Sequence, residues 1–173
     1  MLKRIFFSLL FFVLLIVLGS FLLPKHYEVK RSVVINATKQ DVHAMVNDLQ
    51  QWDRWAPWVE ADPSLQITPG EITSGVGASQ HWLGKDGDGR LQFTDSDPDR
   101  GVEYDIWFMQ DAYQSKAKFD YIEQEDGTKV VWSMAGEMPT PVVGPYMAML
   151  MDTTGGPMFE QGLEKLKQVV EEN

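Results

Sequence analysis

The 173-residue chain is about the length of one domain, and its 44% hydrophobic and 23% charged residues are typical of a globular protein. A formal net charge of −10 disfavours nucleic acid as a partner, because such a protein repels phosphate backbones. The chain contains no cysteine, which excludes disulfides and thiolate metal sites.

The first element is an uncharged apolar run over residues 5–23, in which Ser8 and Ser20 are the only polar side chains. At a helical rise of ~1.5 Å per residue it spans ~28 Å, close to the hydrocarbon thickness of a bilayer. The alternatives are a cleaved signal peptide and a buried core helix. The run is long for a signal peptide and lacks the polar face of a core helix, so we favour an uncleaved transmembrane anchor.

The cations around this run do not decide its orientation, because Lys3 and Arg4 precede it while Lys25, Lys30 and Arg31 follow it. The short basic tip is similar to that of a bacterial signal anchor. We therefore expect a single-pass protein of the cell (inner) membrane with its soluble domain on the extracytoplasmic side.

The chain divides at the end of this run into an anchor, residues 1–24, and a domain, residues 25–173. The domain holds all 25 acidic side chains against 13 Lys and Arg, a net charge of −12. A charge of this sign favours a solvated surface and disfavours binding to anionic lipid headgroups.

The domain begins with an alternating, β-branched run at residues 26–35, which predicts a strand. A helix is predicted to follow, with Thr38 as its N-cap and Asp41 in its first turn. Four apolar side chains share one face of that helix: Val42, Met45, Val46 and Leu49.

Five further strands are predicted at residues 77–84, 89–96, 101–109, 115–124 and 128–137. Turn residues separate them at positions 86–89, 97–101 and 125–127, which indicates an antiparallel meander. Alternation along these strands predicts one large apolar face. It includes Val102, Tyr104, Ile106 and Phe108, and also Val130, Trp132, Met134 and Gly136.

The end of the chain, residues 146–172, has helical periodicity. One stripe is apolar: Phe159, Gly162, Leu163, Leu166 and Val170. We expect residues 155–157, Gly-Gly-Pro, to kink or break this helix. Because the sheet has one apolar face and this helix is the longest element able to cover it, the fold class is α+β.

Three stretches together resemble a known family: HYEVKRSVVINATKQDVHAMVNDLQQWDRWAPW, GVGASQHWLGKDGDGRLQFTDSDPDRGVEYDIWF, and TKVVWSMAGEMP followed by GPMFEQGLEKLK. They are similar to the polyketide cyclase/dehydrase-type branch of the START-like (SRPBCC) helix-grip superfamily, over nearly all of residues 26–170. The resemblance implies a curved antiparallel sheet wrapped on a long C-terminal helix, with a cavity that commonly holds an apolar small molecule or lipid. It does not imply a reaction, because the superfamily includes cyclases, dehydratases, lipid carriers and hormone receptors. This sequence departs from the family pattern by its N-terminal anchor, which a freely diffusing carrier would lack.

The run WDRWAPW at residues 52–58 holds three of the six tryptophans. It resembles the family's corner between the first helix and the second strand, which favours a packing role. The other interpretation is a rim that touches a ligand. Trp55 is the candidate for both.

We expect the cavity wall and ligand-binding site to consist of the inward-facing side chains. They are Trp55, Gln80, Trp82, Phe93, Tyr104, Ile106, Phe108, Phe119, Tyr121, Trp132 and Met134, joined by Leu91 and by Met147, Met149 or Met151. Aromatic and methionine side chains suit an apolar guest of variable shape. The same residues would also suit a solid core, and alternation does not decide between the two.

Motifs for catalysis and metal binding are weak. His26, His43 and His81 match no hydrolytic triad and no zinc spacing, and His81 is expected at the surface. An acidic run at residues 95–99 fails as a calcium loop, since Arg100 occupies the glycine position. We therefore expect neither a metal nor a cofactor.

Three functions remain open. The first is a membrane-tethered binding module for an apolar small molecule or lipid. The second is a cyclase- or dehydratase-like enzyme acting in the same cavity, with Tyr104 or Glu137 as acid or base. The third is a protein-interaction domain with a filled core.

Overall fold

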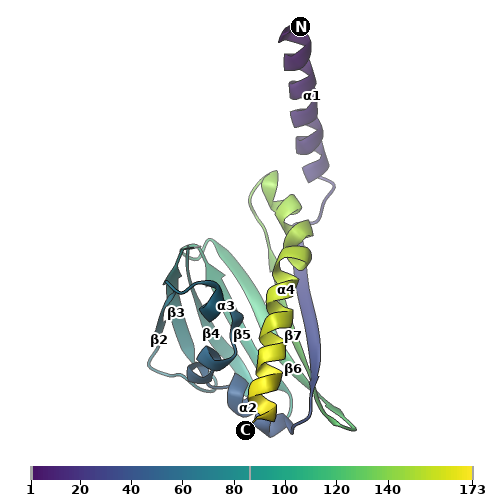
Figure 1. The fold of residues 1–173 in the computed structure, drawn as a ribbon. Coiled ribbons are helices and arrows are strands. Elements are labelled where there is room, and N and C mark those ends of the chain that lie inside the picture. Colours follow the sequence, from purple (N-terminus) through teal and green to yellow (C-terminus); the bar gives the residue numbers. More distant parts are fainter. Residues whose placement is uncertain (1, 86, 173) are drawn as a thin grey trace.

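The computed structural model describes residues 2–85 and 87–172. Its N-terminal helix α1, Leu2–Ser20, extends away from the rest of the chain, which forms one folded domain (Figure 1). The predicted apolar run continued to residue 23, but the helix ends at Ser20. The backbone N–H groups of Phe21 and Leu22 donate to the carbonyl oxygens three residues earlier, at N···O distances of 3.2 and 3.0 Å. Pro24 disfavours helical backbone at Leu23, the residue before it.

The domain is built on one antiparallel sheet of seven strands in the order β1-β7-β6-β5-β4-β3-β2. The strands are β1 His26–Ile35, β2 Gln66–Pro69, β3 Ser79–Gly84, β4 Gly87–Asp97, β5 Gly101–Phe108, β6 Tyr113–Gln124 and β7 Gly127–Glu137. The predicted meander is confirmed, with β1 added beside β7. The edge strand β2 was not predicted, because four residues ending in proline are too few to show alternation.

Glycine is required where the turn after β4 enters β5. Gly101 has φ +135°, and a Cβ atom there would collide with the carbonyl oxygen of Phe119 on the neighbouring strand. L-residues rarely adopt this backbone conformation. The tight hairpin therefore depends on this residue.

Three short helices connect β1 to β2: α2 Lys39–Val46, the 3₁₀ helix η1 Leu49–Arg54, and α3 Pro57–Ala61. The predicted N-cap of α2 is confirmed as a capping box. The Thr38 hydroxyl accepts from the backbone N–H of Asp41, and the Asp41 carboxylate accepts from the backbone N–H of Thr38, both at 3.2 Å.

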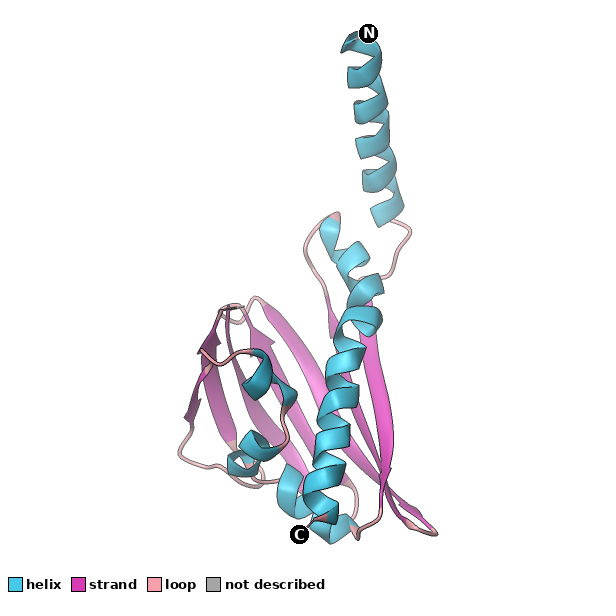
Figure 2. Cartoon of the chain, viewed as in Figure 1, coloured by secondary structure: helices cyan, strands magenta, loops and turns pink. Residues whose placement is uncertain are grey.

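The last helix, α4 Val143–Glu171, lies lengthwise over the sheet, with β1 and β7 beneath it (Figure 2). Residues 155–157 were expected to kink or break this helix; they do not break it, and α4 continues through Pro157. Arg31 of β1 reaches this turn, where Nη1 pairs with Asp152 and Nε with Glu160, each at 2.6 Å. These ion pairs link the helix on both sides of the proline to one strand.

One half of the space between sheet and helices is filled. Its side chains are almost fully buried: Val42, Val46, Trp55, Phe93, Phe119, Tyr121, Leu163 and Leu166. The tryptophan corner packs here, with the Trp52 ring 5.1 Å from that of Trp55 and 6.2 Å from that of Phe119. Both buried indoles are satisfied, since Trp52 Nε1 donates to the Val46 carbonyl at 2.8 Å and Trp55 Nε1 to the Met45 carbonyl at 3.2 Å.

Candidate functional site

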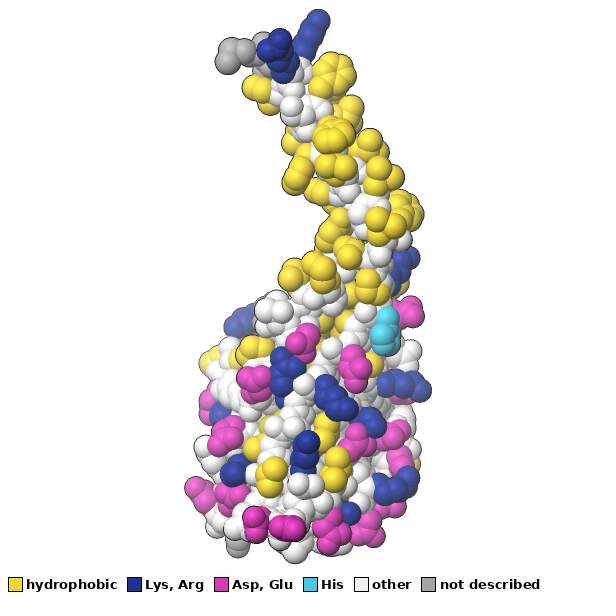
Figure 3. Space-filling view, turned by 90° about the vertical axis from the view of Figure 1, so that its right-hand side faces the viewer, with side chains coloured by type: hydrophobic (Ala, Val, Ile, Leu, Met, Phe, Trp, Pro, Cys, Tyr) yellow, Lys and Arg dark blue, Asp and Glu magenta, His cyan; other side chains and the backbone are white. Residues whose placement is uncertain are grey.

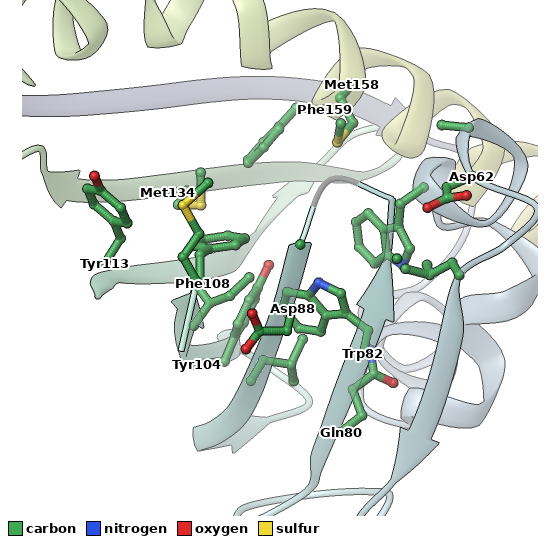
Figure 4. Close-up of a pocket in the computed structure, with 18 of the residues that line it drawn as sticks. Asp62, Gln80, Trp82, Asp88, Tyr104, Phe108, Tyr113, Met134, Met158 and Phe159 are labelled. Atoms are coloured by element: carbon green, nitrogen blue, oxygen red, sulfur yellow. The ribbon is translucent and has the colours of Figure 1, made fainter. Parts of the chain in front are cut away.

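The other half of this space is a cavity of about 440 Å³ between the sheet and the first half of α4 (Figure 4). Its floor is formed by β3, β4, β5 and β7, and its roof by α4. Three exposed methionines among its lining residues mark the opening: Met109, Met147 and Met158. The cavity is therefore a half-open apolar chamber, not a sealed void.

Seven of the side chains predicted to face inward line this cavity: Gln80, Trp82, Tyr104, Ile106, Phe108, Trp132 and Met134. Leu91, Met147 and Met151 line it as well, whereas Met149 projects outward and is 55% exposed. That these residues bind a ligand stays a prediction.

Four predicted side chains do not reach the cavity: Trp55, Phe93, Phe119 and Tyr121. All four are buried in the filled half, beneath α2, η1 and the end of α4 or beside them. Phe93, Phe119 and Tyr121 face inward as alternation required, whereas Trp55 follows η1 and was expected from the tryptophan corner. Strand alternation assigns a face of the sheet and not a position along it, so it did not separate the three strand residues from the cavity wall.

The sequence pattern missed part of the lining. Trp52 and Trp58 enter it from the tryptophan corner, where Trp55 had been the expected contact, and Ile67 enters from the unpredicted strand β2. Phe159 contributes from α4 and stacks on Trp132 with ring centroids 4.2 Å apart. The spacing of three in WDRWAPW did not signal this division, because residues three apart lie on the same side of a helix.

Polar groups on the wall are few. The hydroxyls of Tyr27 and Ser115 bond each other at 2.6 Å, and Tyr113 bonds Thr140 at 2.7 Å. Tyr104 Oη accepts from Trp132 Nε1 at 3.0 Å. Tyrosine and indole groups of this kind orient a guest without charging the site.

Charge on the lining is confined to two carboxylates, Asp62 and Asp88; none of its described residues is Lys, Arg or His. Asp62 accepts from the Ser64 hydroxyl at 2.6 Å and from the Lys85 backbone N–H at 2.9 Å, which holds the pKa of this carboxyl below its usual range. Asp88 accepts from the backbone N–H of Gln110 at 3.1 Å. Both carboxylates are thus engaged by the protein's own chain.

The two candidate acid–base residues differ in placement. Glu137 is exposed at the end of β7 and does not line the cavity. Tyr104 lines it, but burial raises the pKa of its hydroxyl far above the usual value. A tyrosine in this state donates a hydrogen bond far more readily than it gives up its proton.

The remaining candidates lie elsewhere. His81 is exposed on β3, as expected. Asp95 and Asp97 pair with Arg100 at 3.1 and 3.0 Å, so the residue that departs from the calcium pattern offsets part of the negative charge of this turn. Within residues 2–85 and 87–172, no three His, Asp or Glu side chains gather as metal ligands.

Comparisons with solved structures show the fold. The chain is similar to a Staphylococcus aureus protein of unknown function at a TM-score of 0.64 and 13% identity, covering 86% of this chain and 96% of that one. A Thermobifida fusca protein matches at 0.63 and 20% identity, over 84% and 93% of the two chains. The Chromobacterium violaceum protein CV1439 matches at 0.58 and 16%, over 84% and 98%. Among curated proteins, no sequence matches the chain significantly.

A family model agrees with the fold and with the resemblance seen in the sequence. The model described as polyketide cyclase / dehydrase and lipid transport matches residues 26–171. That range begins with β1 and ends with α4, and it includes every strand of the sheet. The chain therefore belongs to the polyketide cyclase/dehydrase and lipid transport family of START-like helix-grip proteins.

Proposed function

We propose that the protein is a membrane-tethered binding module that holds an apolar small molecule or lipid between its sheet and α4. The observation that carries this proposal is the half-open cavity of about 440 Å³ in an otherwise filled core. Its volume lies within the ~300–1,000 Å³ range of small-molecule sites. The family description, which includes lipid transport, supports the same class of ligand.

The side chains that would touch the ligand are adaptable. Six methionines line the cavity besides its aromatic residues: Met109, Met134, Met138, Met147, Met151 and Met158. Methionine is unbranched and polarizable, so it adjusts to guests of different shape. This composition favours a flexible or irregular apolar guest over a rigid polar one.

Residues 1–24 serve as the membrane anchor in this proposal, and residues 25–173 as the domain. The segment Lys3–Ser20 has a mean hydropathy of 2.1 and is 6% buried, so it packs against almost nothing in the described chain. A helix so apolar and so exposed needs a lipid environment. The short basic tip favours the cytoplasm for the N-terminus and the extracytoplasmic side for the domain.

The anchor and the cavity mouth lie at the same end of the domain. The Tyr146 hydroxyl of α4 donates to the Ile16 carbonyl of α1 at 2.8 Å, and exposed Val143 and Leu150 extend the apolar surface. Figure 3 shows hydrophobic side chains continuing from α1 onto this end, whereas charged side chains crowd the opposite end. A ligand entering beside Met147 would leave the bilayer without crossing much water.

Native mass spectrometry of the full-length protein, purified in mild detergent from its own host, tests ligand binding. We expect a mass increment that denaturation releases. Met151→Trp places a large side chain in the cavity and should abolish the increment. Met149→Trp, on the exposed side of the same helix, should retain it. A bare mass for the unsubstituted protein would refute the proposal.

Membrane attachment is tested separately by fractionating cells that produce the full-length chain. We expect it in the membrane fraction at full mass, resistant to a carbonate wash. Recovery of a shortened chain in the soluble fraction would identify residues 1–24 as a cleaved signal peptide. Ligand binding by the domain would stand in that case.

A further inference from the structure

The Tyr104 hydroxyl on the cavity wall uses only part of its hydrogen-bonding capacity within the protein. Tyr104 is 3% exposed, and its hydroxyl oxygen accepts from Trp132 Nε1 at 3.0 Å. Its own hydrogen has no acceptor among the residues that the structure describes. Figure 4 shows the hydroxyl directed from β5 toward α4, across the cavity.

This unused donor distinguishes Tyr104 from the other tyrosines that line the cavity. The hydroxyls of Tyr27 and Tyr113 are paired with Ser115 and Thr140. A buried donor left without an acceptor costs free energy, so buried polar groups nearly always find a partner. The Tyr104 hydroxyl is therefore available to donate a hydrogen bond to a molecule bound in the cavity.

The charge of the wall limits what that occupant can be. The only charged side chains among its described residues are Asp62 and Asp88, and each already accepts from a backbone N–H. A carboxylate or phosphate group inside would lack a counter-charge and would face two like charges. Burying an unpaired charge is costly, so the group near Tyr104 has to be uncharged.

We propose that the bound molecule is an uncharged apolar compound carrying an oxygen acceptor, such as the carbonyl of a ketone or ester, that accepts from the Tyr104 hydroxyl. This inference rests on the proposed ligand-binding function and specifies its ligand class. Gln80 is 6% exposed, and its side chain has no partner among the described residues. Because an amide offers both a donor and an acceptor, it does not select between ligand classes. The preference for one ligand class therefore depends on Tyr104.

The hydroxyl stays protonated in this role. Burial raises the pKa of Tyr104 well above its ordinary value. The donor is therefore present across the physiological pH range, and ligand preference should not change with pH through this group.

Calorimetric titration of the full-length protein in detergent tests the inference with three probes that share one ring system: naphthalene, methyl naphthyl ketone and naphthoate. The wild-type protein should bind the ketone more tightly than naphthalene, and naphthoate most weakly. Tyr104→Phe removes the hydroxyl and keeps the ring, so it should weaken ketone binding about threefold to tenfold and leave naphthalene unchanged.

Tyr121→Phe is the matched control, because Tyr121 is a buried tyrosine that does not line the cavity and whose hydroxyl has no partner among the described residues. It should leave the affinities for all three probes unchanged. A ketone preference that survives Tyr104→Phe, or naphthoate binding as tight as that of the ketone, would overturn the inference while the cavity still binds naphthalene. If the wild-type protein binds none of the probes, the proposed function fails with it.

A spectroscopic measurement on the wild-type protein covers the case in which Tyr104→Phe does not fold, since Trp132 loses its acceptor in that variant. The infrared stretch of a carbon-13-labelled ketone carbonyl falls when the oxygen accepts a hydrogen bond. We expect a lower frequency for the bound ketone than in an alkane solvent. An alkane-like frequency would show that no donor reaches the carbonyl.

Discussion

The inner face of the sheet is divided into two halves that the same strands build in different ways. Phe119 of β6 lies in the filled half and is almost fully buried, whereas Phe108 of β5 is half-buried on the cavity wall. Both side chains point to the same face. The difference comes from what covers them: the tryptophan corner and the end of α4 over one, and a methionine-rich stretch of α4 over the other.

This contrast shows how one sheet can serve both stability and binding. Close packing in the filled half supplies the burial that holds α4 to β1, and it anchors the wall of the hollow half. Tyr104 and Trp132 lie at the boundary, joined by a hydrogen bond and stacked into the aromatic cluster through Phe119. The filled-core alternative therefore describes half of the domain.

The largest expected effect is a charge placed in the filled half. Leu166 is fully buried, and Leu166→Asp should lower the free energy of unfolding by several kcal/mol, enough to unfold a marginal domain. Met147→Asp, at the 43% exposed cavity rim of the same helix, should cost far less. Tryptophan fluorescence during thermal unfolding reports on the domain alone, since α1 has no tryptophan. Equal losses would contradict the division into two halves.

Removing an aromatic ring from each half sharpens the comparison. Phe119→Ala should destabilise the domain by ~3–5 kcal/mol, as a cavity opens in close-packed surroundings. Phe108→Ala should cost clearly less, because its ring already borders empty space and has fewer contacts to lose. The urea midpoints of the two variants measure this difference. A larger loss of stability for Phe108→Ala would show that the cavity wall contributes more to the stability of the fold than the filled half does.

Two glycines of α4 provide a smaller and opposite pair of effects. A Cβ atom on Gly162 would lie 2.8 Å from the Trp132 ring and 3.0 Å from Pro57, so Gly162→Ala should destabilise by ~1–3 kcal/mol. A Cβ on Gly155 would meet Val29 at an ordinary 3.7 Å, so Gly155→Ala should stabilise the helix by up to ~1 kcal/mol. Melting temperatures that shift in the same direction would contradict this pair.

The smallest effect concerns the ion pairs of Arg31, which span the boundary between the halves of α4. Arg31 holds the pKa of the Asp152 carboxyl below its ordinary value. The pair therefore stabilises the folded state at pH values above the unfolded-state pKa of Asp152. This stabilisation is lost as the pH falls through the folded-state pKa. We expect the melting temperature of Asp152→Asn to fall less steeply in acid than that of the wild type. Identical slopes would show that this exposed pair contributes nothing measurable.

The sequence by itself determined the order of the long strands and of the helices α2 and α4, because each of them depended on a local signal. Alternation marked the long strands, the Thr38 capping box marked the start of α2, and a stripe through Leu163 and Leu166 marked the buried face of α4. Where local signals were short or conflicting, prediction failed. The four-residue strand β2 was missed, and the break expected at Pro157 is absent where Arg31 joins the helix to β1.

Only the tertiary structure decided which inward-facing side chains line a cavity. Alternation gave Phe119 and Phe108 the same assignment, and the tryptophan run gave Trp55 as the candidate where Trp52 and Trp58 reach the site. Whether a cavity forms depends on how much of the sheet α4 and the tryptophan corner cover. That is set by the placement of elements that are remote in sequence. The unused hydrogen of Tyr104 likewise depends on the tertiary structure. A hydroxyl lacks an acceptor only when the side chains packed around it place none within hydrogen-bonding distance.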